Sequence, residues 1–160
     1  MRITEIEGDA RSKMVPGLMH NRRMLEAWMR PCEDICMMCD DCAQSHKALT
    51  WILNLPDTRV FAILSDRNFY IGCMYFIDND FHGTAFDGRL RDKEGVVQEA
   101  FQEILKDHDE ILMHVPETTP LIANWAKTIG FQFDADLGPV WDDGDSMKNV
   151  ERLVFNGLRG

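Results

Sequence analysis

The sequence lacks any apolar run near the roughly 20 residues that a membrane-spanning helix needs. Its first residues also lack the apolar segment of a secretory signal. Basic residues are few, because 17 Lys and Arg stand against 27 Asp and Glu, and the net charge is −10. A chain this negative is repelled by a phosphate backbone. We therefore expect no nucleic acid and no membrane as partner, and a location in the cytoplasm.

Repeats and low-complexity tracts are also missing, and the cysteines do not suggest a disulfide framework. There are five cysteines, an odd number, and four of them are crowded into residues 32–42. Such a pattern fits a reducing compartment better than a secreted scaffold. With 160 residues, 45% of them apolar, the chain is long enough to bury a sizeable core. We expect one domain that spans residues 1–160.

The four crowded cysteines are the first candidate for a functional site. They are Cys32, Cys36, Cys39 and Cys42. The spacing of the first three resembles that of iron–sulfur ligands, and four cysteines can also bind zinc. On one helix, however, all four fall on a single face, which cannot surround a tetrahedral ion. Because the stripe continues through Ala43, Thr50 and Leu53, we favour reduced thiols packed against a sheet and no bound metal.

Hydrophobic periodicity predicts a mixed sheet with helices. The expected strands cover residues 2–5, 59–64, 69–77, 81–86, 110–115, 131–133 and 150–155. The expected helices cover residues 17–29, 31–53, 94–107 and 120–129, and an acidic, solvated loop precedes the last strand. Short turns in the first half predict an antiparallel meander, whereas the strand–helix–strand crossover that follows it implies a mixed sheet. The predicted fold class is α/β (α+β), with a mixed, mostly antiparallel central sheet flanked by helices.

The helix at 120–129 has an apolar stripe of its own. Leu121, Trp125 and Ile129 follow one another at a spacing of four residues. Residues so spaced lie along one face of a helix. We expect this face to pack against the sheet.

The segment 111–131 resembles the second conserved block of the GCN5-related N-acetyltransferases. It reads Ile-Leu-Met-His-Val-Pro-Glu-Thr-Thr-Pro-Leu-Ile-Ala-Asn-Trp-Ala-Lys-Thr-Ile-Gly-Phe, a strand and a short helix that ends in a Gly–Phe step. The predicted order of elements is similar to that family along nearly the whole chain. The resemblance implies an acyl-CoA N-acyltransferase-like fold, acetyl-CoA or coenzyme A as co-substrate, and a small-molecule or peptide amine as acceptor.

The resemblance also implies a cofactor site where the fourth strand passes into the next helix. There the family has a glycine-rich turn whose N–H groups hold the pyrophosphate. In this chain Gly95 fits the pattern, whereas Asp92 and Val97 depart from it. The candidate cofactor residues are Arg89, Arg91, Lys93, Gly95, Val96, Val97, Thr119 and Asn124. The alternative is that Asp92 and Glu94 only complement the positive end of the helix dipole.

Transfer of an acetyl group to an amine needs a base that takes the ammonium proton. The candidates near strand ends are His82, Asp87, His114 and Glu117. We favour Asp87 and His114 as catalytic residues, although a histidine in an apolar strand is often only a core residue. Ala126 stands where many family members carry a tyrosine that protonates the leaving thiolate.

Two other functional classes remain open. One is a non-catalytic binding or structural module that keeps this fold, for example in a viral particle. The other is a cysteine-ligated metal protein. The sequence gives neither the acceptor nor the oligomeric state, and a homodimer is one option.

Overall fold

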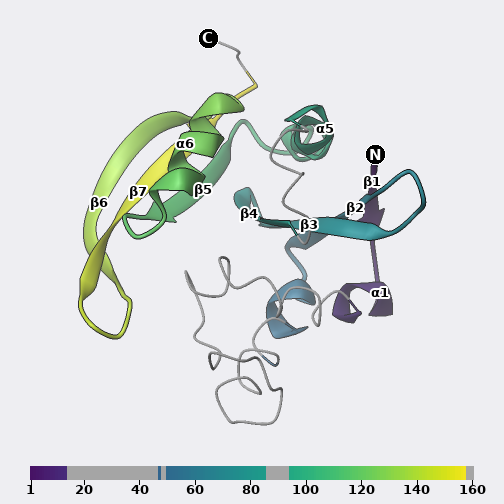
Figure 1. Ribbon diagram of the computed structural model, residues 1–160, viewed down its shortest axis with the longest axis horizontal. Coiled ribbons are helices and arrows are strands. Elements are labelled where there is room, and N and C mark those ends of the chain that lie inside the picture. The colour runs from purple at the N-terminus through teal and green to yellow at the C-terminus, as the bar shows by residue number, and fades with distance from the viewer. Residues whose placement is uncertain (14–46, 48–49, 86–93, 158–160) are drawn as a thin grey trace. The chain divides into compact units, whose positions relative to one another are not determined.

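The computed structural model describes residues 1–13, 47, 50–85 and 94–157 (Figure 1). Its strands are β1 (Arg2–Ile6), β2 (Thr58–Leu64), β3 (Tyr70–Ile77), β4 (Asp80–Ala85), β5 (Ile111–Pro116), β6 (Gln132–Asp142) and β7 (Met147–Phe155). Its helices are α1 (Asp9–Ser12), α5 (Glu94–Leu105) and α6 (Pro120–Thr128). No helix in this part of the chain is long and apolar enough to cross a membrane.

The strands form a mixed seven-stranded sheet in the order β1-β2-β3-β4-β5-β7-β6. The pairs β1–β2, β2–β3, β5–β7 and β6–β7 are antiparallel, and the pair β4–β5 is parallel. This arrangement confirms the predicted fold class, and the antiparallel β2–β3 pair is the first part of the predicted meander. By internal contacts the chain divides into two compact units. Unit 1 comprises residues 1–78 and 82–96, and unit 2 comprises residues 79–81 and 97–160.

Unit 1 is built around β2, which is buried along nearly its whole length. A run of this kind is typical of a strand that is covered on both faces. Phe61 on β2 meets Phe76 on β3 edge-to-face, with ring centroids 5.7 Å apart. At the outer side of β2, the Arg59 guanidinium donates two hydrogen bonds to the Glu5 carboxylate, of 2.9 and 2.8 Å. This bidentate ion pair links β1 to β2 in addition to their main-chain pairing.

Unit 2 has an aromatic core formed by Phe81, Phe101, Phe131 and Phe155, all of them buried. Phe101 on α5 touches the other three rings, with centroid distances of 5.1, 5.6 and 5.0 Å. Such offset and edge-to-face contacts add to the free energy gained by burying the rings. The core therefore ties α5 to β4, to β7 and to the segment that follows α6.

Gly130, the glycine of the Gly–Phe step, is required by this packing. Its φ is +115°, and a Cβ at this position would lie 2.9 Å from the ring of Phe155. A side chain would be both conformationally strained and in collision with the core. The glycine lets the chain turn from α6 directly into Phe131.

Helix α6 contacts β5 (Figure 1), and only part of the predicted face is buried. Ala123, Ala126 and Ile129 are buried, Trp125 is half-buried, and Leu121 is 62% exposed. Leu121 lies about 140° around the helix from Ala126, since each residue turns it by about 100°. The prediction for Leu121 was wrong because two small alanines, not the larger side chains, form the contact surface.

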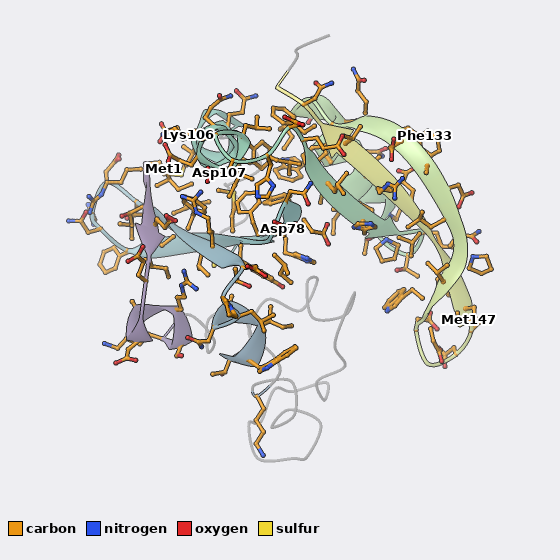
Figure 2. The ribbon with its side chains drawn as sticks, turned by 180° about the vertical axis from the view of Figure 1, so that it is seen from behind. Met1, Asp78, Lys106, Asp107, Phe133 and Met147 are labelled. Atoms are coloured by element: carbon orange, nitrogen blue, oxygen red, sulfur yellow. The ribbon has the colours of Figure 1, made fainter. Side chains whose placement is uncertain are left out.

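The predicted acidic loop was also wrong. Residues 132–142 form one long outer strand, β6, whose pairing with β7 shifts register at three points. Each irregularity interrupts the two-residue alternation that identifies a strand in a sequence. Figure 2 shows Phe133 on this outer strand and Met147 beside the turn that joins it to β7. In that turn the Asp143 carboxylate accepts backbone N–H bonds from Asp145 and Ser146.

The other predicted strands and the helix at 94–107 are confirmed to within a few residues. The predicted helix at 17–29 and most of the one at 31–53, with its four cysteines, lie outside the described residues. Residues 50–53 are helical, as expected, and Leu53 is fully buried.

Replacing Phe101 with alanine is expected to lower the free energy of unfolding by about 3–5 kcal/mol, because the ring is fully buried among three others. The matched control is Phe133→Ala, whose ring is 57% exposed and should change stability by less than about 1 kcal/mol. Urea melts of both variants measure the difference. Equal losses would contradict the assignment of the core.

Candidate functional site

Strand β5 has a buried face and a more accessible face. Ile111, Met113 and Val115 are buried, whereas Leu112 and His114, which alternate with them, are partly exposed. Successive side chains on a strand point to opposite sides of the sheet. His114 therefore lies on the face away from the aromatic core, and its side chain is 26% exposed.

His114 is paired with Asp80, the first residue of β4. Its Nδ1 lies 2.9 Å from the Asp80 Oδ1. Asp80 is brought there by the parallel pairing of β4 with β5, in which it aligns with Leu112. The Leu112 N–H donates to the Asn79 carbonyl at 2.9 Å, and the Asn79 amide donates to the Glu110 carbonyl at 3.1 Å. The Asp80–His114 contact thus rests on backbone pairing.

Two further charged residues continue this row across the sheet. Arg152 on β7 is the cross-strand partner of His114. Its Nε donates a 2.6 Å hydrogen bond to the Oδ2 of Asp134 on β6. Four neighbouring strands therefore contribute Asp80, His114, Arg152 and Asp134 in turn, and we call these four residues the charge row.

The charge row changes the basicity of the imidazole. The hydrogen bond that the ring donates to Asp80 is the largest effect and raises the pKa of His114. Burial lowers this pKa, the negative charge of Asp80 raises it and the charge of Arg152 lowers it, so that the net shift is upward. Because a carboxylate only accepts hydrogen bonds, it places the proton of the neutral ring on Nδ1. Nε2 is then the lone-pair nitrogen. A histidine oriented in this way can take a proton from a bound group.

The other candidate bases are placed less favourably or lie outside the described residues. His82 stacks against the ring of Tyr75, with centroids 4.9 Å apart. Glu117 accepts a 3.3 Å hydrogen bond from the Asn149 amide and donates its own N–H to the Asn149 carbonyl. Asp87 is outside the described residues, so its role stays a prediction.

The predicted cofactor residues fall into three groups. Arg89, Arg91 and Lys93 lie outside the described residues. Near the start of α5, Gly95 is exposed, Val96 is half-buried and Val97 is buried in the core. A Cβ added at Gly95 would meet no atom within 4 Å, so there is room beside its backbone.

Thr119 and Asn124 belong to the third group. The Thr119 hydroxyl donates to the Pro116 carbonyl at 3.1 Å and so stabilises the turn before α6. Asn124 is exposed on the side of α6 away from its buried face. Their contact with a cofactor stays a prediction.

The structure gives no support for a metal centre in the part that it describes. No group of three or more His, Cys, Asp or Glu residues in this part could hold a metal ion. Cys73 is fully buried, and burial raises the pKa of its thiol to about 12, which leaves it unreactive. The cysteines at 32–42 lie outside the described residues, so both interpretations of them stay untested.

Sequence reasoning missed three members of the charge row. Asp80 precedes His114 by 34 positions. Asp134 and Arg152 follow His114 and come from two later strands, β6 and β7. In the sequence, Asp80 falls between two expected strands and Asp134 falls in the expected acidic loop. Their roles depend on strand pairing, which leaves no local signal in a sequence.

Solved structures show which known fold this is. No protein-family model matches the sequence, and neither does a curated protein. The spermidine N-acetyltransferase of Vibrio cholerae in complex with CoA and spermine superimposes with a TM-score of 0.69 at 15% identity, over 96% of this chain and 95% of that one. A single-residue variant of that enzyme gives 0.68 at 13% identity, over 98% and 95%. A chimera of that enzyme with hSSAT gives 0.69 at 11% identity, over 98% and 96%. The chain has the acyl-CoA N-acyltransferase fold of the GCN5-related N-acetyltransferases.

The raised pKa of His114 predicts how stability changes with pH. Because the folded state binds this proton more tightly than the unfolded chain, the stabilisation is complete below the unfolded pKa, near 6.5. It is lost as pH rises through the higher folded pKa. Urea melts from about pH 5 to 9 should show the wild type losing its stability advantage over His114→Gln. An advantage that is constant or grows with pH would contradict the Asp80–His114 pairing.

Proposed function

We propose that this chain is an acyl-CoA-dependent N-acetyltransferase, with acetyl-CoA as donor and a small-molecule or peptide amine as acceptor. The observation that carries the proposal is the likeness, over nearly the full length of both chains, to an enzyme solved with CoA and spermine. The proposal treats residues 1–160 as a single catalytic domain.

The acceptor is an amine that is cationic at neutral pH. The net charge of −10 favours the approach of such a molecule. A polyamine is the first compound to test, since spermine is bound in the similar structure.

In the proposed reaction His114 acts as the general base. Its Nε2 takes a proton from the ammonium group of the acceptor, and the neutral nitrogen attacks the carbonyl carbon of the acetyl thioester. The C–N bond forms and the C–S bond breaks. The nitrogen, which becomes cationic on attack, loses its second proton to water to give the neutral amide, and coenzyme A leaves as a thiolate that takes a proton from water. Thiols have a pKa near 8.5, so the thiolate can leave without a protein acid. This agrees with Ala126, which is fully buried where many family members carry the tyrosine.

The donor is proposed to bind along residues 89–97. The backbone at Gly95 is open, and the first N–H groups of a helix attract an anion such as a pyrophosphate. Arg89, Arg91 and Lys93 would add positive charge there. Thr119 and Asn124 are proposed as contacts from the start and the outer side of α6.

A non-catalytic module with the same fold is the second candidate. Two observations favour it. Val97 is buried in the core although the family pattern has a small residue beside the phosphates, and acidic Asp92 occupies another position of that pattern. Cofactor binding separates this candidate from an enzyme.

Calorimetric titration with acetyl-CoA tests the proposal. The wild type should release or absorb heat, and Gly95→Leu should weaken binding at least about 10-fold by blocking the approach of the phosphates to the backbone. The variant should fold normally, because an added Cβ meets no neighbour and glycine is a poor helix residue.

Gln102→Leu is the matched control. It adds the same side chain at an exposed position two turns later on α5 and should leave the affinity unchanged. If titration of the wild type with millimolar acetyl-CoA gives no binding heat, the enzyme proposal is contradicted and the non-catalytic module is favoured.

A further inference from the structure

We propose that Asp80 is a positioning residue, which holds the His114 imidazole so that Nε2 receives the proton of the acceptor amine. This inference rests on the proposed function, and it adds a residue that the acetyltransferase resemblance does not supply.

The geometry that supports it begins with the origin of the two side chains. Asp80 and His114 come from two strands that are joined by main-chain pairing, so neither depends on a loop for its position. Their 2.9 Å contact is accessible to small molecules, because the side chains are 32% and 26% exposed. A buried, satisfied core histidine would not have this access.

The second support is the way the remaining charges face the imidazole. On β4 it meets Asp80, and on β7 it meets Arg152, whose charge opposes a proton on the ring. Asp134 on β6 in turn binds Arg152, with Nε and Oδ2 2.6 Å apart. Arg152 is thereby held by a second carboxylate and offset in charge, so Asp80 keeps the stronger influence on His114.

The proton transfer needs only the groups already named. His114 starts neutral, with hydrogen on Nδ1 directed at Asp80, and Nε2 gains the proton that the ammonium group loses. The ring is then an imidazolium whose Nδ1–H still donates to the carboxylate. Asp80 remains ionised throughout and stabilises the cation, and the imidazolium returns its proton to water after each turnover.

Two substitutions should shift this equilibrium in opposite directions, and a third should leave it unchanged. Asp80→Asn removes the main cause of the raised pKa and should lower the pKa of His114. Arg152→Gln removes an opposing cation and should raise that pKa. Glu151→Gln is the matched control, since Glu151 points to the opposite face, where it pairs with Lys127 at 3.4 Å.

The test combines two measurements on the full-length protein. Proton NMR titration gives the pKa of His114, whose signal is identified by its loss in His114→Gln. The pH dependence of kcat/KM for acetyl transfer to one fixed amine gives the pKa of the catalytic base. Because all variants use the same amine, its own titration affects every profile equally.

We expect the NMR pKa and the acid limb of the rate profile to move together. Both should fall in Asp80→Asn, rise in Arg152→Gln and stay in place in Glu151→Gln. His114→Gln should lose about 100- to 10,000-fold in kcat/KM, the usual contribution of a general base. Asp80→Asn should lose at least about 10-fold at the plateau, through misorientation of the ring.

Two results would overturn the inference, and only the second would also overturn the proposed function. If the NMR pKa shifts while the rate profile does not, the pair is structural and another base serves an intact enzyme. If the wild type neither binds acetyl-CoA nor acetylates an amine, the proposed function fails together with the inference. Should Asp80→Asn not fold, Arg152→Gln decides the question by its opposite shift.

Discussion

The parallel pairing of β4 with β5 at Asp80 and Leu112 is the constraint on which unit 2 depends. Neighbouring residues of a strand face opposite sides, so this one contact serves two purposes. Phe81 enters the aromatic core on one side, and Asp80 reaches His114 on the other. A shift of β4 by one residue would exchange them and place a carboxylate among phenylalanine rings.

The aromatic core explains why the accessible face can carry charges. Burial of apolar side chains such as Phe101 and Phe131 stabilises the folded state. The sheet therefore does not depend on the charge row for its stability. Partly exposed ion pairs contribute little to folding, typically up to about 1 kcal/mol. Asp80, His114 and Arg152 are therefore better explained by an effect on basicity than by a role in holding the sheet together.

Strands with regular alternation or dense apolar runs, such as β2 and β5, could be predicted from the sequence because their burial is continuous. The long β6 could not, since its bulges and Asp134 imitate a loop. The face of α6 was mistaken because small alanines pack more closely than Leu121. His114 could be proposed as a base from its residue type, and that role stays a prediction. Its partner Asp80 could not be identified, because a contact over 34 positions depends on the fold.

The most direct test of the central claim is to look for both products of acetyl transfer. Purified protein is incubated with acetyl-CoA and spermine or another amine, and acetylated amine and free CoA are quantified by mass spectrometry. This readout avoids thiol reagents, which would also react with the protein's own cysteines. The account predicts equal amounts of both products, dependent on the amine and nearly abolished in His114→Gln. Products formed at the same rate by that variant would contradict the role of His114, and no product with any amine would contradict the enzyme itself.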